Sequence, residues 1–272
     1  MPVPKTLSPE QIARYEEDGA LFPIPVLSPE EVARFRAGFE ELEARLGGRP
    51  RPIGLSHLFF RWAYELATHP AIADVVEDVL GPDLLLQGSL IICKYPGDSS
   101  YVAWHQDGTY SGLHATPTTS AWIALSESNA GNGCMRVIPG SHRNPILPHA
   151  DTYAPQNLLG HGEEIQVAVD ESQAVDLVLR PGEMSLHQNN IIHGSGPCLS
   201  GVKRIGFVLR FVTPRLEQAD LPITPIRGRA DCPHLPLLSV PPTAGVDEGL
   251  EPWQEYLERR RERQRERRKG TL

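Results

Sequence analysis

The chain has 272 residues with 40% hydrophobic and 22% charged residues, a composition that excludes wholesale disorder. This length favours one domain with a sizeable core. The formal net charge of −8 disfavours a nucleic-acid partner, and no segment approaches the ~18 consecutive apolar residues of a membrane span. Because no signal peptide is visible either, we expect a cytoplasmic protein whose four cysteines are reduced thiols.

Two capping motifs mark helix starts in the first third of the chain. Ser8-Pro9-Glu10-Gln11 and Ser28-Pro29-Glu30-Glu31 each combine a side-chain cap with proline at the first helical position. Behind the second motif, apolar residues recur at helical spacing from Val32 to Leu46. Two further helices are predicted, over residues 58–67 and 70–80.

Beyond residue 81, short β-forming runs alternate with turn residues. The runs are LLLQGSLIICKY, YVAWHQD, TTSAWIALS, GCMRVIPGS, AVDLVLRPGEMSLHQ, NIIHGSG and KRIGFVLRFVTP. Many short strands after an N-terminal helical segment favour an antiparallel sandwich or barrel. Residues 140–170 interrupt the strands and are predicted to form a long loop that covers a site.

These patterns predict a single domain over residues 1–272, mainly β with N-terminal helices. A helical layer is expected over residues 1–80, the β core over 81–214, and a Pro-rich connection with a charged helical tail over 215–272. Residues 255–272 carry eight Lys/Arg and four Glu. We expect a solvated helix with i,i+4 Glu–Arg pairs there, although a basic tail could also contact RNA or an acidic partner.

Two short motifs together carry the chemistry. His105 and Asp107, in Trp-His-Gln-Asp, point the same way if they lie on a strand, and His193 follows two apolar residues downstream. Alone, the first motif is consistent with an exposed pair and the second with a hydrogen-bonded core histidine. Together, two imidazoles and one carboxylate leave three metal positions open, as in non-haem Fe(II) oxygenases. Iron fits this set better than zinc, which remains an alternative.

The strand Lys203–Arg210 has two different faces. Period two puts Arg204 and Arg210 on one face and only apolar side chains on the other. Two arginines on a core strand are costly unless they meet anions or water, and an arginine fork suits a carboxylate. The strand therefore indicates either an anchor for a dicarboxylate co-substrate or a solvated pair on a sheet edge.

The order of motifs resembles the phytanoyl-CoA dioxygenase-like family of Fe(II)/2-oxoglutarate oxygenases. The motifs are H-Q-D, W-x-A-L, N-G-C-M-R-V-I-P-G-S-H, P-G-E-M-S-L-H, H-G-S-G-P and R-I-G-F-x-x-R-F, within residues 8–214. The resemblance implies a double-stranded β-helix (jelly-roll, cupin-like) core. It also implies Fe(II), with 2-oxoglutarate and O2 as co-substrates. The iron ligands that it implies are His105, Asp107 and His193, and the 2-oxoglutarate contacts are Arg204, Ser195 and Trp122.

Several outcomes are compatible with such a site. The resemblance implies hydroxylation of a small-molecule substrate with release of succinate and CO2; desaturation, epimerisation, cyclisation and halogenation are alternatives. The chain is close to the non-haem halogenase branch of the family, in which the carboxylate ligand is Ala or Gly, but here Asp107 is retained. This retention favours oxygenation. A jelly roll that binds a metal or ligand without turnover is a further alternative.

Other polar residues are candidates for contacts with the substrate. Arg210 could bind a substrate anion or pair with a nearby acidic residue. His187, on the strand before His193, could contact the substrate or pack as a hydrogen-bonded core residue. The remaining candidates for the substrate wall are Lys94, Tyr110, His114 and Gln188.

Overall fold

An antiparallel sheet of seven strands runs through the molecule, in a computed structural model that describes residues 4–109, 117–229, 231–238 and 240–268. The strand order is β1-β10-β5-β12-β3-β13, and β2 also pairs with β3. The strands are β1 (Ala20–Pro25), β2 (Ile53–Gly54), β3 (Leu84–Lys94), β5 (Thr118–Ala124), β10 (Glu183–Gln188), β12 (Arg204–Val212) and β13 (Thr224–Arg227).

A second antiparallel sheet faces the first, in the order β4-β11-β6-β9. Its strands are β4 (Val102–His105), β6 (Arg136–Val137), β9 (Val175–Asp176) and β11 (His193–Ser195). Side chains from both sheets share a hydrophobic cluster, in which Trp122 and Ala124 of the larger sheet pack with Met135 and Val137 of the smaller one. Two facing antiparallel sheets form the predicted jelly roll.

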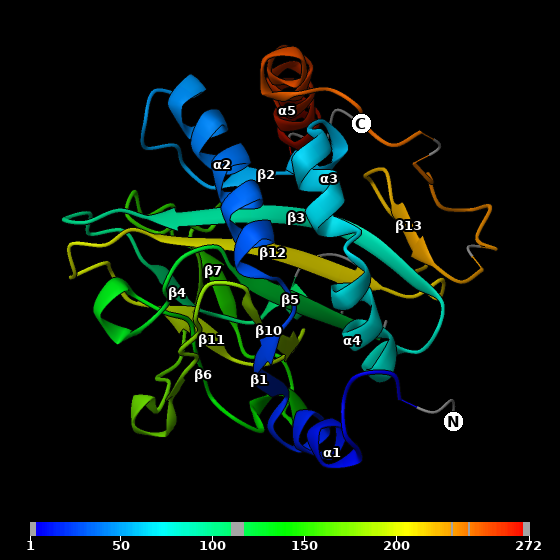
Figure 1. Cartoon of the computed structure of the whole chain (residues 1–272). Coiled ribbons are helices and arrows are strands. Elements are labelled where there is room, and N and C mark those ends of the chain that lie inside the picture. Colours follow the sequence, from blue (N-terminus) through cyan, green and yellow to red (C-terminus); the bar gives the residue numbers. More distant parts are fainter. Residues whose placement is uncertain (1–3, 110–116, 230, 239, 269–272) are drawn as a thin grey trace.

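Helices cover the opposite face of the larger sheet. Figure 1 shows α2, α3 and α5 on one side of β3 and β12, and β4, β6 and β11 on the other. Both capping boxes form as predicted, with the side chains of Ser8 and Ser28 each accepting a backbone N–H in the first turn. The helices are α1 (Pro9–Asp18), α2 (Pro29–Arg45), α3 (Arg61–Ala67), α4 (Pro70–Leu80) and α5 (Val246–Arg268).

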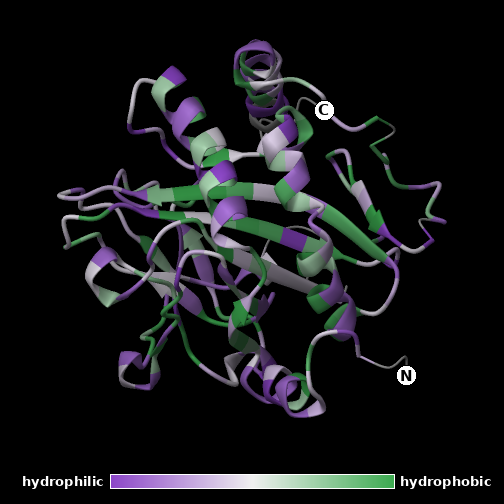
Figure 2. Cartoon of the chain, viewed as in Figure 1, coloured by the Kyte–Doolittle hydropathy of each residue, from purple (hydrophilic) through white to green (hydrophobic). Residues whose placement is uncertain are grey.

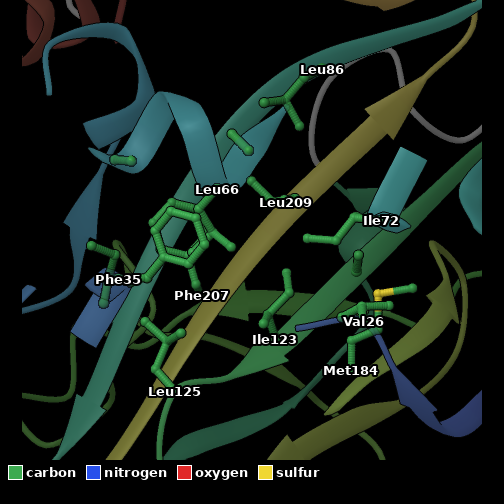
Figure 3. Close-up of a cluster of buried hydrophobic side chains, with 14 of the residues drawn as sticks. Val26, Phe35, Leu66, Ile72, Leu86, Ile123, Leu125, Met184, Phe207 and Leu209 are labelled. Atoms are coloured by element: carbon green, nitrogen blue, oxygen red, sulfur yellow. The ribbon is translucent and has the colours of Figure 1, made fainter. Parts of the chain in front are cut away.

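The main core lies between these helices and the outer face of the larger sheet. Phe35 of α2 and Leu66 of α3 pack there against Phe207 and Leu209 of β12 (Figure 3). The predicted alternation along β12 is therefore real: the apolar side chains enter the main core, and those of Arg204 and Arg210 lie on the other face, toward the smaller sheet. Figure 2 shows that β3 and β12 are largely hydrophobic, whereas α5 is largely hydrophilic.

Three regions differ from the pattern expected from the sequence. In residues 215–272, predicted as a Pro-rich connection and a helical tail, β13 pairs with β3 and extends the larger sheet. β1, within the first third expected to be helical, extends the larger sheet by pairing with β10. Its sequence, ALFPIP, is a short continuous apolar run, which is consistent with a strand. Within residues 140–170, β7 (His149–Asp151) pairs with β8 (Glu163–Ile165), so the predicted long loop contains a hairpin. The 3-10 helices are η1 (Ser56–Leu58), η2 (Asp107–Thr109), η3 (Ala130–Asn132), η4 (Ser141–Arg143) and η5 (Glu171–Gln173).

Two further expectations concern membranes and cysteines. Among the described residues, no helix is both long enough and apolar enough to cross a bilayer. All four cysteines are free and buried.

Gly206 allows Trp122 to lie flat across β12. A Cβ atom at Gly206 would overlap the indole ring. We expect Gly206→Ala to lower the free energy of unfolding by about 1–3 kcal/mol, because overpacking forces the ring or the strand to move. Urea denaturation measures this loss. Gly160→Ala is the control, since nothing lies within 4 Å of its added Cβ; equal stability of the two variants would contradict the prediction.

Candidate active site

The smaller sheet brings two histidines together. His105 ends β4 and lies directly opposite His193 of β11, with the ring centroids 4.0 Å apart. Nδ1 of His105 lies 2.9 Å from the carbonyl oxygen of Ala103, and Nδ1 of His193 lies 3.0 Å from that of Ile191. A carbonyl can only accept, so both Nδ1 atoms carry the proton, and both Nε2 atoms keep a lone pair for a metal or a hydrogen-bond donor.

Asp107 completes the cluster from the first turn after β4. Its side chain is almost wholly buried, and Oδ1 lies 3.7 Å from Nε2 of His105. Burial alone would raise the pKa of this carboxyl, but the charge of Arg210 and the two histidines lower it well below its usual range. The donor atoms of the three residues all lie within 4.8 Å of one another. The structure therefore brings together the three residues predicted as metal ligands.

Both oxygens of Asp107 are held by the larger sheet. Arg210 forms an ion pair with Oδ1 at 2.8 Å, and the hydroxyl of Ser120 donates to Oδ2 at 3.3 Å. Of the two roles considered for Arg210, the structure thus shows pairing with an acidic residue. Ser120 was not identified from the sequence, since its contact depends on the register of β5 with β12.

His187 lies against this cluster without a hydrogen bond. Its ring centroid is 4.9 Å from that of His193, and its side chain is buried. Neither ring nitrogen has a hydrogen-bond partner among the described residues. Burial, reinforced by the nearby His193, lowers the pKa of His187 to about 3, so the ring is neutral at neutral pH. The structure therefore does not support the alternative of a hydrogen-bonded core histidine.

Two buried basic side chains lie together at one end of the inner face. Arg204 and Lys94 are cross-strand neighbours on β12 and β3, and their exposed fractions are 1% and 0%. Within the described part of the chain, neither forms an ion pair with a carboxylate. Burial lowers the pKa of Arg204 to about 10 and, together with the charge of Arg204, lowers that of Lys94 to about 6.

Polar and aromatic groups surround Arg204 and Lys94. Nζ of Lys94 donates to Oγ of Ser195 at 2.6 Å, to the carbonyl of Ser195 at 3.0 Å and to that of Gly196. Arg204 donates to the carbonyl of Gly133, and its Cζ lies 5.1 Å from the centroid of Trp122. Three of the predicted co-substrate residues thus meet at one place. Lys94, expected on the substrate wall, lies with them. It is the direct cross-strand partner of Arg204, so the two side chains lie on the same face of the sheet.

The β7–β8 hairpin is tied to the same cluster through Gln106. The side chain of Gln106 donates to the carbonyl of Asn190 at 2.7 Å and accepts from the backbone of Leu147 at 2.8 Å. Its backbone N–H donates to Nε2 of His149, at the start of β7, at 3.1 Å. The hairpin therefore begins beside Gln106, the residue between His105 and Asp107. Among the substrate candidates, Tyr110 and His114 lie outside the described residues.

Comparisons with known proteins agree with this geometry. A family model described as phytanoyl-CoA dioxygenase (PhyH) matches residues 15–206. The chain belongs to this family. It is 29% identical over 225 residues to the peroxisomal phytanoyl-CoA dioxygenase of Bos taurus, in a match that covers 70% of this chain and 64% of the bovine protein. The match thus spans less than two thirds of that relative.

Other similar proteins match along more of their length. An ectoine dioxygenase of Nocardia farcinica is 26% identical over 230 residues, covering 74% of this chain and 76% of the relative. Among solved structures, a non-heme monooxygenase, ThoJ in its apo form, superposes with a TM-score of 0.73 at 30% identity. That match covers 93% of this chain and 96% of ThoJ, and it confirms the predicted fold.

The lowered pKa of Lys94 has a measurable consequence for stability. The folded protein loses this proton near pH 6, whereas an unfolded lysine keeps it to about pH 10.4. Between these values the unfolded state binds more protons, so Lys94 makes the protein more stable as the pH rises, by up to about 1.4 kcal/mol per pH unit. We expect the unfolding free energy of wild type to rise relative to that of Lys94→Met between pH 7 and pH 9.

Urea denaturation at the two pH values checks this prediction. Lys203→Met is the matched control, because Lys203 is a partly exposed lysine that is ion-paired to Glu43. The control should follow the pH dependence of wild type. A Lys94→Met variant with that same dependence would contradict the prediction.

Proposed function

We propose that this protein is an Fe(II)- and 2-oxoglutarate-dependent dioxygenase that hydroxylates a small-molecule substrate and releases succinate and CO2. One observation carries the proposal: a buried cluster of two imidazoles and one carboxylate shares an inner face with two buried basic side chains, Arg204 and Lys94, that have no acidic partner among the described residues. The first group suits a metal with open positions, and the second suits a dicarboxylate.

The residues present fit iron. His105, Asp107 and His193 would hold it, because two imidazole Nε2 atoms and one ionised carboxylate form the donor set of non-haem Fe(II) oxygenases. The carbonyls of Ala103 and Ile191 fix both rings by accepting from Nδ1, as outer partners of metal-binding histidines do. When bound, the iron would supply the activation of O2 that oxidises 2-oxoglutarate and the substrate together.

The residues present also fit 2-oxoglutarate. Its distal carboxylate would lie against Arg204, Lys94 and the hydroxyl of Ser195, with Trp122 alongside. A carboxylate at this place would compensate the charge of Arg204 and raise the lowered pKa of Lys94. These four side chains would orient the co-substrate, while the hydrophobic cluster shared by the two sheets keeps water from the space between them.

Retention of Asp107 supports hydroxylation over halogenation. A third protein ligand fills the position that a halide would otherwise take. Desaturation, epimerisation and cyclisation use the same donor set and depend on how the substrate is placed. Product analysis separates these outcomes, and a balanced hydroxylation consumes one 2-oxoglutarate and one O2 for each hydroxyl group inserted.

We expect His193→Ala to abolish the release of succinate from 2-oxoglutarate by protein supplied with Fe(II) and O2, because one of three metal donors is lost.

We expect Arg204→Met to release succinate but to need about 10–100-fold more 2-oxoglutarate, since a charge-assisted pair contributes about 1.5–3 kcal/mol. A succinate assay against 2-oxoglutarate concentration measures both effects.

Arg136→Met is the control for loss of an arginine, because Arg136 forms ion pairs with Glu171 and Asp176. It should keep the wild-type requirement for 2-oxoglutarate. Folded wild-type protein that binds Fe(II) and 2-oxoglutarate without forming succinate would contradict the proposal and support a ligand-binding role without turnover.

A further inference from the structure

The geometry points to Arg210 as a positioning residue, which works with Ser120 to clamp the metal-binding carboxylate of Asp107 at both oxygens. This inference rests on the proposed function, because it assigns Arg210 a task toward the metal. It also gives Arg210 a different task from Arg204 on the same strand, although both arginines face the space between the sheets.

The clamp is built from one cross-strand pair. Arg210 of β12 lies directly opposite Ser120 of β5, so both side chains leave the larger sheet side by side on its inner face. Asp107 reaches them from η2, which follows β4 of the smaller sheet. The guanidinium of Arg210 forms an ion pair with Oδ1 of Asp107 at 2.8 Å, and the hydroxyl of Ser120 donates to Oδ2 at 3.3 Å. One ligand is thus carried by one sheet and oriented by the other.

Holding both oxygens has consequences for a metal ligand. A carboxylate free to rotate about its Cβ–Cγ bond can bind a metal through one oxygen or two, and its orientation must be fixed on each binding event. With Arg210 and Ser120 in place, the plane of the carboxylate is set beforehand, and Oδ1 stays beside Nε2 of His105 at 3.7 Å. The cation also offsets the charge of a buried carboxylate.

A role limited to supporting the fold makes a different prediction. If Arg210 only supported the fold by linking the two sheets through Asp107, it would have no function after the carboxylate of Asp107 is removed. A positioning residue keeps its cation aimed at the place where the carboxylate lay. A small carboxylate added from solution would then be captured there, and Arg210 would decide how tightly.

Formate rescue of Asp107→Gly tests this difference with Co(II) as the probe metal, because Co(II) reports its coordination by visible absorption and needs no turnover. We expect formate to bind the Co(II)-loaded Asp107→Gly protein at least about tenfold more tightly than Asp107→Gly/Arg210→Met, since one charge-assisted hydrogen bond is lost. Asp107→Gly/Arg136→Met is the matched control and should bind formate like the single variant.

Equal formate affinity with and without Arg210 would overturn the inference and leave the proposed function standing. Wild-type protein that binds no Co(II) would instead contradict the proposed function, and the inference with it. If Asp107→Gly retains no Co(II), the spectrum of Co(II) bound to Arg210→Met decides. We expect it to differ from wild type, with Arg210→Lys closer to wild type and Arg136→Met identical; an unchanged spectrum in Arg210→Met would overturn the inference.

Discussion

Antiparallel pairing of β4 with β11 sets His105 directly opposite His193, and the rest of the site is arranged around these two imidazoles. Each strand is short and supplies one histidine, and the carbonyl two residues before that histidine, of Ala103 or Ile191, accepts from its ring. A slip of one residue in this register would turn one ring to the other face of the sheet. At the end of the pair where the two histidines lie, the side chain of Gln106 donates to the carbonyl of Asn190 and links the two segments.

The larger sheet adds charge to this frame in two separate places. On β12, Arg204 lies with Lys94 at one end, and Arg210 lies with Asp107 toward the other. Gly206 stands between them, with Trp122 across it. The Arg210 charge is compensated within the chain, whereas that of Arg204 is compensated by no described carboxylate. This asymmetry is why the two arginines receive different roles: one orients a protein ligand, and the other is left for an anion from outside.

Much of this arrangement could be predicted from local patterns. The two capping boxes depend only on neighbouring residues, and the faces of β12 follow from strict alternation against an apolar core. The histidines and Asp107 were predicted as iron ligands because the order of motifs along the chain resembles the phytanoyl-CoA dioxygenase-like family, although each motif alone is unspecific. Local patterns of this kind do not depend on how distant strands pair.

Contacts set by distant strand pairing could not be predicted in the same way. The pairing of Lys94 with Arg204 needs the register of β3 with β12, and the contact of Ser120 needs that of β5 with β12. The ion pair between Arg210 and Asp107 also needs the distance between the two sheets. Strand β1 was missed because it is short and lies between two well-marked helices.

Anaerobic titration of the apo-protein with Fe(II) and 2-oxoglutarate tests directly whether the cluster of His105, Asp107 and His193 is an iron and 2-oxoglutarate site. A co-substrate that chelates Fe(II) through its keto and carboxylate oxygens gives a visible metal-to-ligand charge-transfer band. We expect this band in wild type, at one equivalent of each component, and its loss in His193→Ala. Folded wild-type protein that shows no band at saturating Fe(II) and 2-oxoglutarate would contradict the assignment of this cluster as an iron and 2-oxoglutarate site.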